Sequence, residues 1–348
     1  MPNSQSNRCW RCEEIFSSIL LHSYEGETYC APCLTTIQND EDQYSNNDSD
    51  GDSDYDDGSD SSAIQSWDSK PNPRFHNDNA NVTTVPVTNT IYNKPTLYFG
   101  MELETERKQS NIPTYTAARR FINATDRLVY CKSDMSLREG FEIVTHPMSF
   151  QYIVNHFDNY AAALQSLRSS RYRAWDTSSC GLHIHISKNS FLSVAHEMKF
   201  IYLIYKNERP ISDFVGRNSP FAEFNLDAFL GEYNWDIKKP SITEIVKGVD
   251  KNGNPIHRQD GRNLALNRNN QATHELRIFR PSLQITTVRS YIEFVDCLWH
   301  YAKDVTANDC LKNNALTNFA KFVEYARSTP KYPNFITRLA DPNRYKGE

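Results

Sequence analysis

Four short segments of the chain alternate apolar with polar residues, which is the pattern of a β-strand with one buried face. They cover residues 97–106, 140–146, 181–187 and 274–280. Two longer segments, 191–208 and 285–304, instead repeat apolar residues every three or four positions, which predicts amphipathic helices. The mixture predicts an α+β domain from residue 96 to the end of the chain. Its antiparallel sheet should have one face open to a cleft and should be flanked by helices.

The polar positions of these strands carry ionisable side chains. Each strand by itself is typical of a solvated face or of a cross-strand pair. If the strands pair in one sheet, however, their charged side chains converge on one cleft, together with an aspartate from the loop-like stretch before residue 140. The set comprises Glu102, Glu104, Asp134, Glu142, His183, His185, Glu275 and Arg277.

Five carboxylates in one cleft cannot all stay ionised without cations, because like charges at close range raise one another's pKa. Carboxylate oxygens with one or two imidazoles suit Mg²⁺ or Mn²⁺. The same groups could serve a metal-dependent hydrolase that activates water. At this stage the residues indicate metal-dependent chemistry and leave the reaction open.

The first 38 residues contain two CxxC pairs, formed by Cys9, Cys12, Cys30 and Cys33. Four thiolates with this spacing can surround a Zn²⁺ ion tetrahedrally in a closed structural site. A segment this short cannot bury enough apolar surface to fold without the metal. Residues 1–38 are therefore predicted to be a zinc-binding module. Few basic residues surround the cysteines, which gives a nucleic-acid partner weak support.

Residues 39–95 are predicted to be an acidic, disordered linker. The run from 39 to 62 has almost no apolar side chains, and its self-repelling charge cannot offset the entropy of ordering the chain. The later stretch 67–77 carries aromatic residues and prolines and is expected to dock on the domain that follows. A non-catalytic adaptor, in which the zinc module and the linker are the working parts, is a third alternative.

The composition limits the class of protein but does not indicate a reaction. The chain has 348 residues, 39% of them hydrophobic, which is enough for a sizeable core, and its net charge is −5. The acidic run accounts for that charge, so the remainder is roughly neutral to basic. No apolar run approaches the length of a membrane span, and the N-terminal residues lack a secretory pattern. We therefore expect a soluble, cytoplasmic protein without a membrane partner.

The order of these motifs resembles that of a known family. FGMELE is followed by D-x7-E ending in GFEIVTHP, then by CGLHIHIS, then by ALNRNNQATHELRIFR. This order is similar to that of the phage and bacterial amidoligases, a branch of the carboxylate–amine ligase superfamily that includes glutamine synthetase and the glutamate–cysteine ligases. The resemblance covers residues 96–348, and both KPNPRF and the CxxC pairs also resemble phage members.

The resemblance implies a glutamine-synthetase-like sheet and an ATP-dependent ligase. Such enzymes use ATP with two or more divalent ions, convert a carboxylate to an acyl phosphate, and let an amine displace the phosphate to form an amide. The implied partners are an amine and a carboxylate, with a peptide or protein among the candidates. The implied compartment is the cytosol of a bacterium or of a phage-infected host.

The resemblance also implies roles for single residues. The ion on the acceptor side would be held by Glu104, Asp134 and Glu142. The ion that bridges the ATP phosphates would be held by Glu102, His183 and Glu275. His185 would lie near the transferring phosphoryl group, and Arg277 would neutralise its charge.

Three further residues are matched more loosely as nucleotide or substrate contacts: Arg217, Arg262 and Asn267. GRNLALN resembles the family's pattern of Arg, Tyr, any residue, Ala, any residue, Asn. It departs from that pattern at Asn263, where the family has an aromatic ring, so no stacking is expected from this position.

Overall fold

The computed structural model describes residues 63–66, 71, 74–76, 96–108, 110–175, 177, 179–217, 219–226, 263–312 and 315–341, and the backbone of two short strands near the N-terminus. The chain divides into two compact units, Met1–Asp60 and Ser61–Glu348. Each unit is described by itself.

In the first unit, the described backbone is a hairpin of two antiparallel strands. β1 (Leu21–Tyr24) pairs with β2 (Glu27–Cys30), and Leu21 lies opposite Cys30. In the sequence this hairpin follows the first CxxC pair and ends at Cys30, the first cysteine of the second pair. Cys9, Cys12, Cys33 and the side chain of Cys30 lie outside the described residues, as does the acidic run, so the zinc module stays a prediction.

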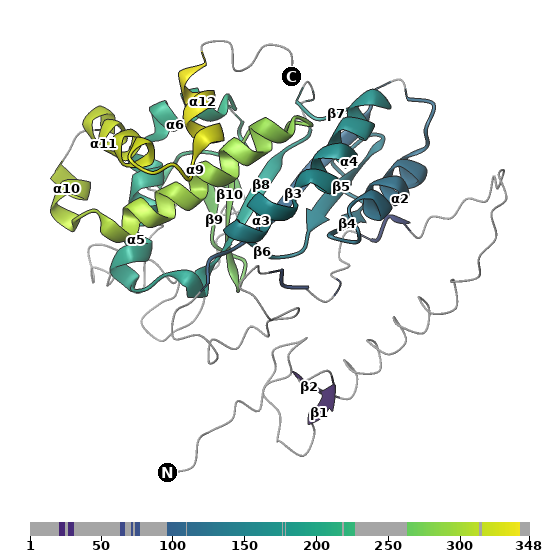
Figure 1. Ribbon diagram of the computed structural model, residues 1–348, viewed down its shortest axis with the longest axis horizontal. Coiled ribbons are helices and arrows are strands. Elements are labelled where there is room, and N and C mark those ends of the chain that lie inside the picture. The colour runs from purple at the N-terminus through teal and green to yellow at the C-terminus, as the bar shows by residue number, and fades with distance from the viewer. Residues whose placement is uncertain are drawn as a thin grey trace. The chain divides into compact units, whose positions relative to one another are not determined.

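The second unit is built on an antiparallel sheet of eight strands among the described residues (Figure 1). They are β3 (Tyr98–Arg107), β4 (Val129–Lys132), β5 (Gly140–Thr145), β6 (Met148–Ser149), β7 (Tyr172–Arg173), β8 (Leu182–Ser187), β9 (Leu266–Asn267) and β10 (Thr273–Phe279). The spatial order is β4-β5-β3-β8-β10-β9, and β6 and β7 pair with the ends of β3. Every pairing is antiparallel, and the four segments predicted from alternation form the centre of the sheet.

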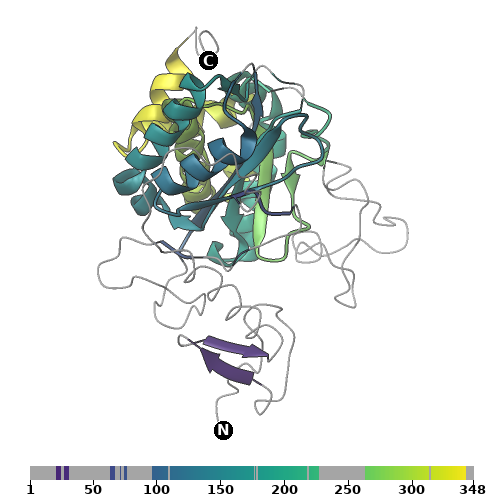
Figure 2. The same cartoon turned by 90° about the vertical axis from the view of Figure 1, so that its right-hand side faces the viewer.

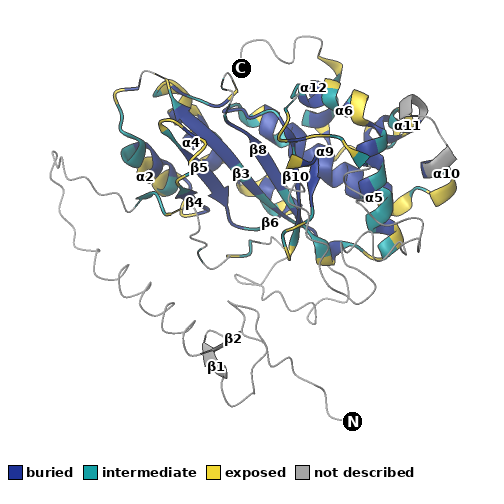
Figure 3. Cartoon of the chain, turned by 180° about the vertical axis from the view of Figure 1, so that it is seen from behind, coloured by how far each residue is buried: buried dark blue, intermediate teal, exposed yellow. Residues whose placement is uncertain are grey.

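The described helices form a layer on one side of this sheet. They are α2 (Thr114–Ala124), α3 (Phe150–His156), α4 (Asp158–Ser169), α5 (Val194–Lys206), α6 (Glu208–Val215), α9 (Ile285–Asp304), α10 (Ala307–Lys312), α11 (Ala315–Arg327) and α12 (Pro333–Ala340). Within this layer, α10 contacts α5, and α11 and α12 contact α9. Figure 2 shows the helical layer on one side, and Figure 3 shows the strands in front of the helices. This confirms the predicted α+β class with an antiparallel sheet open on one face.

The core lies between the sheet and the helices. Phe99, Met101 and Leu103 of β3 are fully buried, as are Ile184 of β8 and Leu276 of β10. Burying a side chain of this size stabilises the fold by about 1.5–3 kcal/mol relative to leaving it exposed. Because alternate residues of a strand face opposite ways, this burial fixes Glu102, Glu104 and their neighbours on the other face.

A glycine permits the close pairing of β3 with β5. A Cβ on Gly140 would lie 2.1 Å from the backbone oxygen of Thr105, a distance that no side chain can tolerate. Any larger residue would therefore separate the two strands at the end where Glu104 and Glu142 face each other.

Described residues between 63 and 76 belong to the second unit and pair with it. The Gln65 amide donates to Cys131 O at 2.9 Å beside the edge strand β4, and the His76 amide donates to Pro147 O at 2.9 Å. The Phe75 ring packs edge-on against Tyr98, with centroids 5.1 Å apart. The stretch around Phe75 thus docks on the domain, as its aromatic and proline content predicts. Nowhere in the described part of the chain is a helix both long and apolar enough to cross a membrane.

Candidate metal centre

Strand register sets the ionisable side chains in rows across the open face. One row runs from Gly100 through His185 and Glu275 to Asn267 on four successive strands. On the neighbouring positions Glu102 lies opposite His183. A further row joins β3, β5 and β4, where Glu104 lies opposite Glu142 and Glu142 opposite Lys132. Strands distant in sequence therefore bring the predicted groups to one surface.

Two carboxylates and an imidazole form the tightest group. Glu102, His185 and Glu275 offer ligand atoms that all lie within 4.8 Å of one another. His183 is also close, because its Nδ1 lies 3.4 Å from Glu102 Oε2 and 3.5 Å from Glu275 Oε1. Both histidines are thus within reach of both carboxylates. The family resemblance implies His183 as the ligand, whereas this grouping contains His185.

The carboxylates and imidazoles of this group shift one another's pKa towards the charged forms. Burial by itself raises the pKa of Glu102, but His185 and His183 hold that pKa well below its usual range. Burial works in the same direction on Glu275, yet the two imidazoles and Arg277 leave its pKa below the ordinary value. Burial lowers the pKa of His185, but the surrounding carboxylates, led by Glu102, outweigh it and raise that pKa. The carboxylates around His185 therefore favour positive charge at this position.

The geometry around His185 suits a metal ligand. Its Nε2 is buried and makes no hydrogen bond, although Glu102 Oε1 lies 3.4 Å away. Its Nδ1 lies 3.0 Å from the hydroxyl of Thr273 on the adjacent strand. A partner on one ring nitrogen orients the imidazole and leaves the other nitrogen for an ion. The residues present therefore fit a divalent cation bound through oxygen and nitrogen.

Glu275 is held from several sides. Asn267 Nδ2 donates to its Oε2 at 2.7 Å, and Asn270 Nδ2 donates to the same oxygen at 3.1 Å. Arg277 donates to its other oxygen, Oε1. These contacts fix a carboxylate that is only 4% exposed. They also give Asn267, predicted to contact substrate or nucleotide, a direct contact with this carboxylate.

A second acidic group lies next to the first. Glu104 and Glu142 are both buried and face each other across β3 and β5, with Lys132 Nζ 3.3 Å from Glu142. Burial first, and then Glu102, raises the pKa of Glu142 to about 8. Burial also raises the pKa of Glu104, with a further contribution from the half-buried Asp134. Two adjacent carboxyls whose pKa values are both raised indicate a place where a cation would be favourable.

Arg217 reaches this face from the end of α6. The helix ends at Gly216, whose φ of 66° is the left-handed conformation that favours glycine, and the turn brings Arg217 against the sheet. Its guanidinium donates to the backbone oxygens of Arg277 at 2.7 Å and Phe279 at 3.2 Å. A Cβ on Gly181 would lie 2.9 Å from His183 Nε2 and 3.0 Å from Arg217. Glycine at this position therefore makes room for both side chains.

The structure brings together most of the predicted site residues. Glu102, Glu104, Glu142, His183, His185, Glu275 and Arg277 share the open face, and Asp134 and Arg217 lie close enough to affect the pKa of Glu104. Arg262 lies outside the described residues. Sequence reasoning missed Lys132, Asn270 and Thr273. Alternation with Glu275 could have indicated Thr273, whereas Asn270 lies in a turn and Lys132 needs the pairing of β4 with β5.

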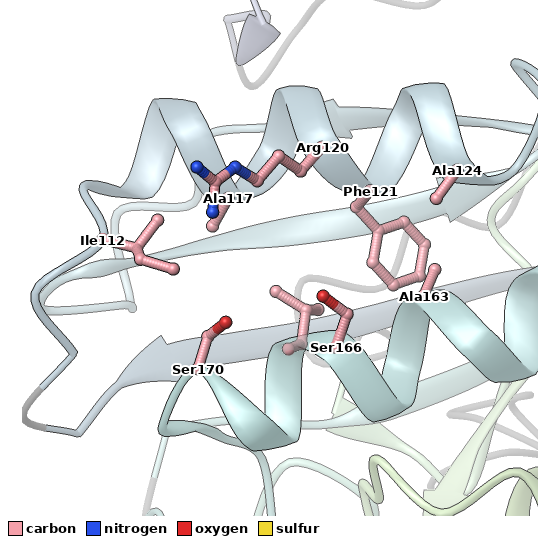
Figure 4. A pocket seen from close by; sticks show the side chains of 9 residues that line it. Ile112, Ala117, Arg120, Phe121, Ala124, Ala163, Ser166 and Ser170 are labelled. Carbon is pink, nitrogen blue, oxygen red and sulfur yellow. The ribbon is translucent and has the colours of Figure 1, made fainter.

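A cavity on the helical side does not belong to this site. Figure 4 shows it between α2 and α4, with Phe121 and Arg120 on one wall and Ser166 and Ser170 on the other. Its volume of about 30 Å³ has room for a water molecule or two, far less than a nucleotide needs.

Comparison with known proteins finds no protein-family model that matches the chain and no match to a curated protein.

Proposed function

We propose that residues 96–348 form an ATP-dependent carboxylate–amine ligase with a glutamine-synthetase-like fold, related to the amidoligases. The observation that carries the proposal is the convergence of four strands, β3, β5, β8 and β10, on one surface with buried carboxylates, two imidazoles and an arginine. Buried charges of this kind cost stability, so a scaffold or adaptor has no reason to retain them.

Each of the two acidic groups would bind its own divalent ion. Glu102, Glu275 and an imidazole would hold Mg²⁺ or Mn²⁺ against the ATP phosphates, and Glu104, Glu142 and Asp134 would hold a second ion beside the acceptor carboxylate. Bound divalent ions neutralise phosphate charge and orient the two reactants. His185 and Arg277 would lie beside the transferring phosphoryl group, where a cation stabilises the developing charge. Arg217, Arg262 and Asn267 remain candidates for contacts to nucleotide or substrate.

The proposed reaction has two balanced steps. First, a carboxylate oxygen of the acceptor attacks the γ-phosphorus, the bond to the β-phosphate oxygen breaks, and ADP leaves with an acyl phosphate formed. Then the amine nitrogen attacks the acyl carbon, phosphate departs with the C–O bond electrons, and the nitrogen loses a proton. The products are an amide, ADP and phosphate. The site can contribute by positioning and by charge alone, because phosphoryl transfer needs little else from a protein.

The first unit and the linker have a proposed role as well. We infer that Cys9, Cys12, Cys30 and Cys33 bind a structural Zn²⁺, and that this module tethers a peptide or protein acceptor in the cytoplasm. Tethering raises the effective concentration of a substrate without altering the site.

The test is release of ADP from ATP and Mg²⁺ while pools of amino acids, polyamines and peptides are offered. We expect ADP release that depends on an added amine or carboxylate and disappears in Glu275→Ala. The matched control is Glu139→Gln, an exposed carboxylate beside β5 that pairs with Arg107 at 3.1 Å. Hydrolysis of a substrate without ATP would support the metal-dependent hydrolase instead. Absence of both, with zinc-dependent binding of a protein partner, would support the adaptor.

A further inference from the structure

Lys188 makes contacts that the proposed chemistry does not use. It follows β8 directly, and its backbone amide donates to Ala272 O at 2.9 Å. Its Nζ donates to Arg268 O at 2.8 Å and also to Asn270 O. One ammonium group therefore holds two carbonyl oxygens of the turn between β9 and β10.

That turn carries the groups that hold Glu275. Asn267 precedes it and Asn270 lies within it, and the side-chain amides of both donate to Glu275 Oε2. The Asn269 amide donates to Asn267 Oδ1 at 2.9 Å, which closes the start of the turn. Displacing the carbonyl of Asn270 would displace its side chain as well, because both belong to one residue of a tight turn. The chain of contacts runs from Lys188 through Asn270 to Glu275.

Burial and charged neighbours surround the Lys188 ammonium. It is half-buried, and the charged or titratable groups that affect it are Glu197 of α5, Arg268 of the turn and His274 of β10. Burial lowers its pKa to about 8. Burying part of the Lys188 ammonium costs free energy, and water could act as donor to the carbonyl oxygens of Arg268 and Asn270 without that cost. The lysine therefore fixes the position of the turn in a way that water would not.

We propose that Lys188 is a positioning residue that, acting through Asn270, fixes the carboxylate of Glu275 for metal binding. The proposal rests on the metal site of the proposed function, but it does not depend on ATP turnover. Groups in the outer shell of a metal site orient its ligands, and their loss typically weakens affinity by about 10–100-fold.

The probe is Mn²⁺, and its binding to the full-length protein is measured by titration calorimetry. We expect Lys188→Met to weaken Mn²⁺ binding about tenfold and Lys188→Arg to restore most of the affinity, since a guanidinium can also donate to two carbonyls. The matched control is Lys199→Met. Lys199 likewise caps two backbone oxygens, Lys303 O at 3.2 Å and Val305 O at 2.7 Å, at the end of α9 away from the open face.

A double-mutant cycle distinguishes positioning from a general structural role. If Lys188 acts through Asn270, then Lys188→Met combined with Asn270→Ala should weaken Mn²⁺ binding no more than Asn270→Ala alone. Fully additive losses, or equal losses in Lys188→Met and Lys199→Met, would overturn the proposal. If Lys188→Met does not fold, Lys188→Arg and the Asn270→Ala variant still decide it, because normal affinity in Asn270→Ala removes the link to Glu275. Wild type that binds no Mn²⁺ would overturn this proposal and the metal site together, whereas Mn²⁺ binding without ADP release would contradict only the proposed reaction.

Discussion

Replacing Glu142 by Gln should stabilise the metal-free protein and reduce its response to metal. The Glu142 carboxyl has an ordinary pKa of 4.5 in the unfolded chain, and burial with neighbouring carboxylates raises its pKa to about 8 in the folded state. Between these values the folded state holds a proton that the unfolded state has lost. The contribution of Glu142 to the free energy of unfolding is therefore fully present below pH 4.5 and is lost as the pH rises towards 8.

The magnitude follows from the same shift. From the ordinary pKa of 4.5 to pH 7 is about 2.5 pH units. At about 1.36 kcal/mol for each pH unit, the free energy of unfolding falls by about 3 kcal/mol over this range. The amide of Gln avoids this loss but weakens the contact with Lys132, whose Nζ lies 3.3 Å from Glu142 Oε2. We expect a net gain of about 1–2 kcal/mol, or a rise in Tm of roughly 2–8 °C.

The assay is thermal unfolding in EDTA from pH 5 to pH 9, repeated with Mn²⁺. Glu142→Gln should unfold at a higher temperature than wild type in EDTA at neutral pH, and should gain less from Mn²⁺ because it lacks an anionic ligand. Glu139→Gln is the control, since its carboxylate is 64% exposed and its loss should change stability by less than about 0.5 kcal/mol. A lower Tm for Glu142→Gln in EDTA at every pH would show that ionisation of Glu142 does not destabilise the folded protein.

Three further predictions concern protons and ligand orientation. Binding of Mn²⁺ at pH 7 should release protons, because Glu142 must ionise to bind the ion; equal calorimetric heats in two buffers of different ionisation enthalpy would contradict this. Thr273→Val should weaken Mn²⁺ binding about tenfold with little change in Tm, because His185 Nδ1 loses its partner; unchanged affinity would argue against His185 as a ligand. Burial lowers the pKa of His146 to about 3, so stability is present above pH 6.5 and is lost as pH falls, by about 3 kcal/mol between pH 7 and pH 4.5. His146→Gln should show a shallower acid loss in urea unfolding, and an identical loss would remove His146 as its source.

Alternation along the strands was enough to predict the sheet and its polar face. Apolar residues such as Phe99 and Leu276 are buried against the helices, and the glutamates between them face the other way. A period of two residues sets which side chains share a face, and this holds whatever the strand order is. The fold class and the membership of the open face could therefore be read from the sequence.

Register and the turns could not be read in this way. Only the pairing of β3 with β5 shows that Glu104 meets Glu142, and only the pairing of β4 with β5 brings Lys132 to that pair. The residues that hold Glu275 are polar residues of a turn, which has no periodic signal. Lys188 acts on that turn across a gap of some 80 residues in the sequence. Such contacts depend on tertiary structure, which local patterns do not encode.

Metal-dependent ATP binding at the open face is tested most directly by calorimetry of ATP binding with and without Mg²⁺, comparing wild type with Glu275→Ala and with the Glu139→Gln control. We expect wild type and Glu139→Gln to bind ATP only when Mg²⁺ is present, and Glu275→Ala to lose this binding while it still unfolds cooperatively. Mg²⁺-independent ATP binding that survives in Glu275→Ala, or no ATP binding by wild type, would contradict this expectation.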